Sequence, residues 1–108
     1  MYKLDDIPIG AENAISRKAL ANLWNVSDRK ARRIVADMRT IEDGTDYVIV
    51  SVSRGAGYYR TQNLCEIHHF TNEMRKRIRS TYRAIKVAQR IAHRLKQQAD
   101  YGGKGLAG

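Results

Sequence analysis

Two short segments near the start of the chain carry apolar residues at intervals of three and four. In residues 17–24 and 28–41 these are Ala19, Leu20, Leu23 and Trp24, and Ala31, Ile34, Val35, Met38 and Ile41. Such spacing places side chains on one face of an α-helix. Ser16 and Ser27 stand before the segments as helix caps, and Asn25 between them tolerates the left-handed backbone of a tight turn. The pattern predicts two short helices joined by a turn.

The next part of the chain has the alternation of a β-strand. Residues 47–53 (YVIVSVS) are rich in β-branched and aromatic side chains, residues 54–57 (RGAG) form a glycine-bearing turn, and residues 58–61 (YYRT) resume an extended pattern. We therefore expect a β-hairpin from about Tyr47 to Thr61. Because neighbouring strand residues face opposite sides, one of Tyr58 and Tyr59 should be buried and the other exposed.

A long helix is predicted from Asn63 to about Gln98, a stretch without Gly or Pro in which Asn63 and Glu66 have capping-box spacing. Its apolar and small residues recur in steps of four and three, the pattern of a heptad seam: Ile67, Thr71, Met74, Ile78, Thr81, Ile85, Ala88, Ala92 and Leu95. We expect a mainly α protein with a small β-hairpin (α+β), in which residues 1–61 form one domain, residues 62–98 the long basic helix and residues 99–108 a disordered, glycine-rich tail. Residues 1–13 support at most a turn of helix near residues 11–15.

Charge changes this picture because it is unevenly distributed. The 108 residues include 20 Lys+Arg and 11 Asp+Glu, for a net charge of +9, yet residues 1–73 contain ten of each. The excess lies in the last third, where six basic residues form a stripe along the long helix: Arg75, Arg79, Arg83, Lys86, Arg90 and Arg94. Such a surface favours a polyanion, first of all nucleic acid, with an acidic protein face or an anionic membrane surface as alternatives.

Several other classes of protein are disfavoured. No apolar run approaches the roughly 18 residues of a membrane span, and the first ten residues carry acids where a secretory signal has a basic region. The single cysteine, Cys65, permits no intramolecular disulfide, so we expect a cytoplasmic protein. Cys65, His68 and His69 share a helical turn, but only His93 remains as a further soft ligand, and we expect no metal and no cofactor. The chain has no phosphate-binding glycine loop, paired carboxylates or Ser-His-Asp order, so we expect no enzyme.

Two motifs carry a resemblance to a known family. The stretch LANLWNVSDRKARRIV (residues 20–35) resembles the helix-turn-helix of bacterial and phage regulators, with Asn25 at the turn position usually held by glycine and Ala31 where a larger residue is common. The stretch GAGYYR (residues 55–60) looks like the wing that follows it. Over residues 10–61 the chain thus resembles the winged helix-turn-helix DNA-binding proteins, especially small members encoded by phages or mobile elements.

The resemblance implies that the second helix enters the major groove while the first helix and the wing contact the DNA backbone or minor groove. The DNA-binding residues implied are Arg17, Lys18, Ser27, Asp28, Arg29, Lys30, Arg32, Arg33, Arg54 and Arg60. The alternative is that these basic residues form only a solvated helix surface.

Three functions are left open by the sequence. The first is a sequence-preferring double-stranded DNA-binding protein, either a transcriptional regulator or a replication accessory. The second is a small phage inhibitor of a host nucleic-acid-binding protein, of anti-restriction or anti-CRISPR type, acting through the basic helix on an acidic protein partner. The third is an RNA or single-strand binder. We also expect a homodimer formed through the seam residues Met74, Ile78, Ile85 and Leu95, unless the seam packs back on its own chain or binds a different protein.

Overall fold

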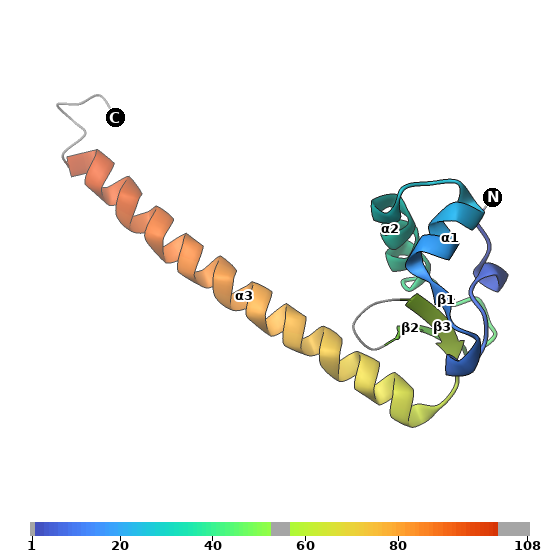
Figure 1. Ribbon diagram of the computed structural model, residues 1–108. Coiled ribbons are helices and arrows are strands. Elements are labelled where there is room, and N and C mark those ends of the chain that lie inside the picture. Colours follow the sequence, from blue (N-terminus) through green and yellow to red (C-terminus); the bar gives the residue numbers. More distant parts are fainter. Residues whose placement is uncertain (1, 53–56, 102–108) are drawn as a thin grey trace. The chain divides into compact units, whose positions relative to one another are not determined.

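The computed structural model describes residues 2–52 and 57–101 (Figure 1). The elements in chain order are the 3-10 helices η1 (Leu4–Asp6) and η2 (Ala11–Asn13), strand β1 (Ile15–Ser16), helices α1 (Arg17–Trp24) and α2 (Asp28–Met38), strands β2 (Val48–Ser51) and β3 (Gly57–Thr61), and helix α3 (Leu64–Tyr101). Helices dominate and the strands form one small antiparallel sheet, so the α+β class is confirmed. In the described ranges, no helix has both the length and the apolar content to cross a membrane.

The chain divides into two compact units, Met1–Thr71 and Asn72–Gly108. Helix α3 begins in the first unit and continues through the second. The first unit therefore includes the first two turns of α3, which lie beyond the boundary at residue 61 that the sequence suggests.

Local capping fixes α1 and α2 as expected. The Ser16 hydroxyl accepts a hydrogen bond from the Ala19 N–H at 3.0 Å, and the Ser27 hydroxyl accepts one from the Lys30 N–H at 3.1 Å. Asn25, between the helices, has the left-handed backbone angles φ 55° and ψ 48°. Each bond satisfies an N–H that the first helical turn leaves without an intrahelical acceptor. The predicted pair of helices and their turn are confirmed.

The hydrophobic core of the first unit joins α1 and α2 to the sheet and to the segment before them. Its buried members are Ile7, Leu20, Ala21, Trp24, Ala31, Val35, Ile49 and Tyr58. The small side chain of Ala31 is completely buried and belongs to the same core as Trp24. Ile41, predicted on the inner face of the second helix, is instead 71% exposed because α2 ends at Met38.

The sheet has the strand order β1-β3-β2, with both pairs antiparallel. The predicted hairpin is confirmed in β2 and β3, where Val48 pairs with Thr61 and Ser51 with Tyr58. Strand β1 was not predicted, because two residues are too short to give an alternating pattern. It approaches β3 so closely that a Cβ at Gly57 would collide with the carbonyl oxygen of Ile15.

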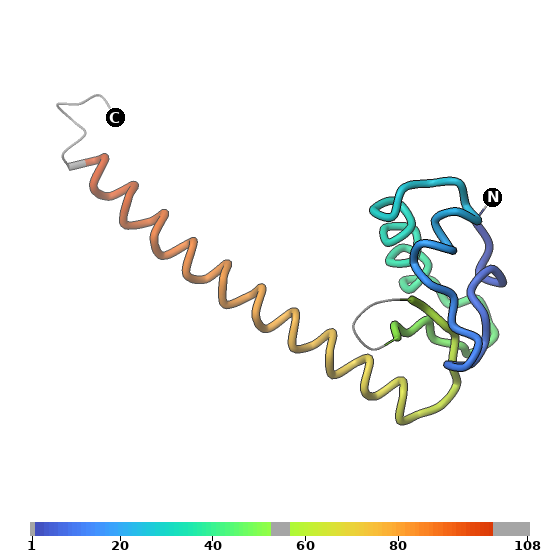
Figure 2. The backbone as a smooth tube through the Cα atoms, viewed as in Figure 1, coloured from blue at the N-terminus to red at the C-terminus, as the bar shows by residue number. Residues whose placement is uncertain are grey.

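The segment before α1 runs beside β3 (Figure 2). The Arg60 N–H donates to the Pro8 carbonyl at 2.7 Å, and the Gly10 N–H donates to the Arg60 carbonyl at 3.0 Å. The first residues of the chain thus extend the sheet edge that β1 begins, and they bring Ile7 into the core.

Both tyrosines of β3 are buried, so the prediction that one of them is exposed is wrong. Tyr58 lies in the core, whereas Tyr59 faces the other side of the sheet, where the Glu66 carboxylate of α3 accepts its hydrogen bond. Burial and this bond both raise the pKa of Tyr59. The sheet is covered on both sides because the first turns of α3 belong to this unit.

The start of α3 is capped through a relay. The Asn63 side-chain oxygen accepts from the Glu66 N–H at 3.0 Å, as predicted. The Glu66 carboxylate accepts from the Thr61 hydroxyl at 2.5 Å, and that hydroxyl accepts from the Asn63 N–H at 3.0 Å. At the other end, residues 99–101 are helical, which corrects the prediction that the disordered tail begins at residue 99; residues 102–108 lie outside the described residues.

A partly buried hydrogen bond between Asp6 and Trp24 predicts a pH dependence of stability. The Trp24 indole N–H donates to the Asp6 carboxylate at 2.8 Å, and this bond is the main reason that the pKa of Asp6 lies below its ordinary value. A lowered pKa stabilises the fold above the unfolded-state pKa of about 3.9, and this stabilisation is lost as the pH falls through the lower folded-state pKa.

We therefore expect Asp6→Asn to cost about 1 kcal/mol at pH 6 and less at pH 2.5, measured by urea unfolding. Trp24→Phe, which removes the donor, should weaken the acid dependence in the same way. An equal cost of Asp6→Asn at both pH values would contradict the assignment.

Candidate nucleic-acid interface

Helix α2 buries one side and presents basic residues on the other. Ala31 and Val35 are buried and Ile34 packs against the same core. At about 100° per residue, Arg29 and Arg33 then lie on the opposite side of the helix. Both are exposed, as are Lys30 and Arg32 beside them. The structure thus brings these four predicted residues to one accessible surface.

Asp28 ties the first turn of α2 to the first turn of α1. Its carboxylate lies 3.2 Å from Nε of Arg32 and 3.8 Å from Nε of Arg17. Asp28 therefore holds two guanidinium groups near the N-terminal ends of both helices. Ser27 uses its hydroxyl oxygen to cap the helix. The sequence grouped both residues with the predicted DNA contacts, whereas the structure shows what each side chain does within the fold.

The order of charges along α1 and α2 opposes the stability of the helices themselves. Arg17 and Lys18 begin α1, Arg29 and Lys30 lie in the first turn of α2, and neither helix has a basic residue in its last turn. A cation at a helix N-terminus interacts unfavourably with the helix dipole, by roughly 0.3–1 kcal/mol. Asp28 in the first turn of α2 and Arg39 at its C-cap partly offset this arrangement. The pattern indicates that these cations serve a purpose other than folding.

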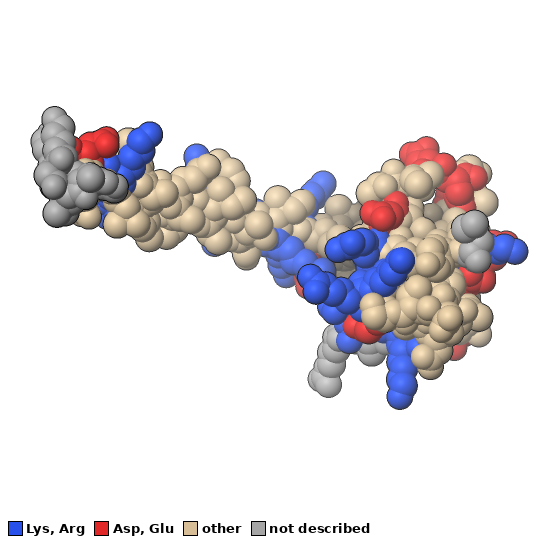
Figure 3. All heavy atoms as spheres, turned by 90° about the horizontal axis from the view of Figure 1, so that it is seen from above, with Lys and Arg blue, Asp and Glu red and all other residues tan. Residues whose placement is uncertain are grey.

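The beginning of β3 lies close to this cluster of charges. The pKa of Tyr58 is raised chiefly by burial, and the charges that act on it include those of Arg17, Asp28 and Arg32. Tyr58, near the start of β3, therefore lies within electrostatic range of the side chains at the N-terminal ends of both helices. Figure 3 shows Lys and Arg side chains gathered over one part of the amino-terminal unit. Arg54, predicted at the hairpin tip, lies outside the described residues.

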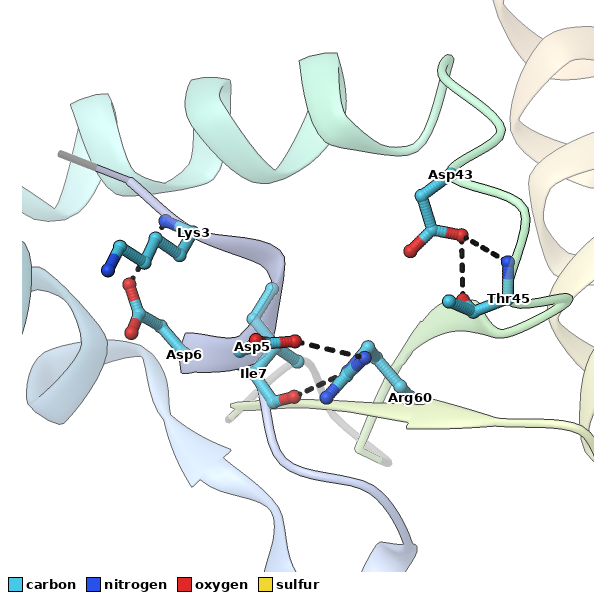
Figure 4. A network of polar contacts seen from close by, with 7 residues as sticks. All are labelled: Lys3, Asp5, Asp6, Ile7, Asp43, Thr45 and Arg60. Atoms are coloured by element: carbon cyan, nitrogen blue, oxygen red, sulfur yellow. Dashed lines mark hydrogen bonds and ion pairs between the residues drawn. The ribbon is translucent and has the colours of Figure 1, made fainter.

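Arg60 was predicted to contact DNA, and the structure corrects this assignment. Its side chain is only 10% exposed, and its Nε donates to the Ile7 carbonyl at 2.7 Å (Figure 4). The guanidinium also lies 3.8 Å from the Asp5 carboxylate and 5.6 Å from the centre of the Tyr47 ring. Arg60 joins β3 to the segment before α1, and its low exposure gives it a structural role in place of the predicted exposed one.

Arg39 is a second arginine with a structural role, which the sequence did not reveal. Its guanidinium lies 5.6 Å from the centre of the Tyr58 ring and 4.7 Å from that of Phe70. Its Nε donates to the Ile49 carbonyl at 3.0 Å, and Nη2 donates to the Ser51 hydroxyl at 3.1 Å. One side chain at the end of α2 thus fixes the helix to the hairpin and to the first turns of α3. Its charge alone gave no sign of this.

The second unit carries the remaining predicted basic residues on α3. All six predicted residues of the polyanion-binding stripe are exposed, and they are Arg75, Arg79, Arg83, Lys86, Arg90 and Arg94. Near its end, Lys86, Arg90 and Arg94 line a shallow groove together with Gln89 and His93. The Lys86 ammonium also lies 5.4 Å from the centre of the Tyr82 ring. The helix therefore offers a row of accessible cations at a spacing that can follow phosphates.

Metal binding receives no support from the residues that the structure describes. Among them, no three or more His, Cys, Asp or Glu side chains gather closely enough to hold an ion. Cys65 is exposed on α3.

No family model, curated protein or solved structure that was compared with the chain matches it. Function is therefore inferred from the charged side chains of α1, α2 and α3 themselves.

Proposed function

We propose that the protein is a winged helix-turn-helix that binds double-stranded DNA with a sequence preference. In this proposal α2 is the recognition helix, α1 crosses the DNA backbone and the β2–β3 hairpin is the wing. The observation that carries the proposal is the exposed basic side of α2, opposite its buried Ala31 and Val35. The short turn between the helices, with its left-handed Asn25, supports it.

The dimensions and chemistry of α2 suit the major groove. An α-helix with its side chains is about 10–12 Å wide, and the groove is about 12 Å wide. Arg29 and Arg33 are one helical turn apart on the outward side, so both can reach base edges from the same approach. A guanidinium grips guanine O6 and N7 through two hydrogen bonds, which is why arginine at this place confers sequence preference.

Other residues around this helix suit phosphate contacts. Arg17 and Arg32 are oriented by Asp28, and Lys18 is exposed in the first turn of α1. Phosphate contacts fix the register of a protein on the duplex without reading its sequence. The division assigns base reading to the outward side of α2 and backbone clamping to the residues around Asp28.

Within this proposal the protein acts as a transcriptional regulator or a replication accessory, and its resemblance to small phage and mobile-element proteins is the basis for proposing such a source. The second candidate is an inhibitor of a host nucleic-acid-binding protein, favoured by the exposed basic residues of α3 that lie outside the α1–α2 surface. Selection of bound sequences from a pool of random duplexes separates the two. We expect one enriched motif; an inhibitor that does not bind DNA would enrich none.

Binding to duplex DNA should weaken steeply as salt is added. If about four to seven phosphates are neutralised, the slope of log K against log salt should be roughly −4 to −6, because counterions are released. Fluorescence anisotropy on a labelled duplex measures this slope when the salt concentration is raised roughly sixfold, from about 50 to about 300 mM. Lys18→Ala should reduce the slope by about one.

The matched control is Lys3→Ala. It removes the same charge from a residue that belongs to neither α1 nor α2, and it should leave the salt slope unchanged. A slope near zero for the unmodified protein would contradict the proposal.

A further inference from the structure

The second unit exposes a continuous apolar surface along α3. Met74, Ile78, Thr81 and Ile85 line a groove with Tyr82 and Arg77, and Leu95 is exposed further along the helix. Ile78 is 66% exposed and Leu95 is 59% exposed, which is unusual for residues on one side of a helix that is otherwise highly charged. Such a surface indicates an interaction site.

The positions on this surface keep a strict heptad spacing. Steps of four and three connect Met74, Ile78, Thr81, Ile85, Ala88, Ala92 and Leu95. A 3.5-residue repeat stays on one side of a helix only when the helix supercoils with a partner, and at 1.5 Å per residue this seam is about 30 Å long. We propose that it pairs with the same seam of a second copy of the chain in a parallel, in-register coiled coil.

The placement of charge argues that the partner is a second copy and not an acidic protein. Lys76, Arg79, Arg83, Lys86, Arg90 and Arg94 all lie at heptad positions on the outer side, away from the seam. An acidic helix docked on the seam would leave these cations unmatched. Only three basic residues flank the seam, and they are Arg75, Arg77 and Lys96.

The flanking residues also fit each other across a parallel pair. In such a pair a residue on one flank faces the residue five positions later on the other flank of the second chain. The facing pairs are Arg77 with the partner's Tyr82, Ala84 with the partner's Gln89, and Ile91 with the partner's Lys96. None of these pairs opposes two cations, and one places an arginine beside an aromatic ring.

One antiparallel arrangement is disfavoured by charge. It sets Ile78 opposite the partner's Leu95. It also brings Arg75 against the partner's Lys96, and two-fold symmetry repeats this contact. Like charges that face each other across a coiled coil disfavour that pairing. Charge therefore disfavours this register, and the orientation itself is tested by cross-linking.

Parallel pairing has a consequence that rests on the proposed function. It would attach both amino-terminal units at the same end of the coiled coil, so that two recognition helices can address half-sites on one duplex. The outward cations of α3 would remain accessible to phosphates. The pairing itself requires no DNA and is tested without it, so its failure is distinguishable from failure of DNA binding.

Cross-linking of single cysteines tests the orientation. In a Cys65→Ser background, Thr81→Cys and Ala92→Cys each place one thiol in the seam, and Ser80→Cys and His93→Cys place one on the neighbouring residue outside it. Under a glutathione redox buffer, both seam variants should form disulfide-linked dimers, at least several-fold more than their controls. In an antiparallel pair neither seam position faces its own copy, so neither variant alone should exceed its control, and that result would overturn the proposal.

Sedimentation equilibrium tests the pairing independently. At tens of micromolar and without DNA, the mass should be near twice the chain mass of 12.3 kDa. Ile78→Asp with Ile85→Asp should restore 12.3 kDa. Ser80→Asp with Gln97→Asp adds the same charge outside the seam and should leave the dimer intact. A mass of 12.3 kDa for the unmodified protein would overturn the proposal.

Discussion

Replacing Arg29 or Arg33 with alanine is expected to remove most of the sequence preference of DNA binding. Each substitution should cost about 1–3 kcal/mol on the preferred sequence, or roughly 5- to 150-fold in affinity, and much less on random duplex. Competition between a selected sequence and random duplex at fixed salt measures the ratio. The reason is that a base contact is lost only where the right base is present.

The folded state should tolerate both substitutions. Within the described residues, Arg29 and Arg33 enter none of the ion pairs of α2, whereas Arg17 and Arg32 are held by Asp28. Exposed substitutions of this kind usually change stability by about 0.5 kcal/mol or less. A loss of binding can therefore be attributed to the interface once urea unfolding shows unchanged stability.

The matched comparison uses two arginines of α3. Arg83→Ala and Arg90→Ala remove the same group from exposed helical positions in the second unit. They should weaken binding to all sequences alike and reduce the salt slope by about one each, because phosphate contacts carry no sequence information. If all four variants lose affinity equally on selected and random DNA, the assignment of α2 as the recognition helix is wrong.

Local rules predicted the helices and their turn well. Ser16, Asn25, Ser27 and Asn63 act within three residues of their own positions, so the sequence around each contains all the information that the cap requires. The hairpin was predictable for the same reason, since β2 and β3 are close in sequence. These elements bring the basic residues of α1 and α2 together, so this grouping could be predicted from the sequence.

Long-range contacts explain what the sequence could not reveal. Arg60 and Arg29 are both arginines in a segment that resembles a DNA-binding motif, yet one is buried and the other exposed. The buried side chain of Arg60 donates its hydrogen bond to the carbonyl of Ile7, which lies 53 positions earlier in the chain. Tyr59 is similarly covered by Glu66, which follows the hairpin. No local pattern of polar and apolar residues contains these contacts.

The contacts of Arg60 differ greatly in the stability they provide. Its ion pair with Asp5 spans 3.8 Å, and the Asp5 side chain is 90% exposed, so solvent screens it and the pair should contribute less than about 1 kcal/mol. The hydrogen bond to the Ile7 carbonyl is buried and 2.7 Å long. Losing a partner in a buried hydrogen bond costs about 1–3 kcal/mol, and the contact with the Tyr47 ring adds about 0.5–1 kcal/mol.

Arg60→Met is therefore expected to destabilise the protein by about 2–4 kcal/mol, whereas Asp5→Asn should cost less than about 1 kcal/mol. Urea unfolding followed by tryptophan fluorescence measures both, because Trp24 lies in the core of the same unit. At a temperature where Arg60→Met is still folded, its salt slope for DNA binding should equal that of the unmodified protein. The reverse result, with stability kept and the slope reduced by about one, would return Arg60 to the DNA interface.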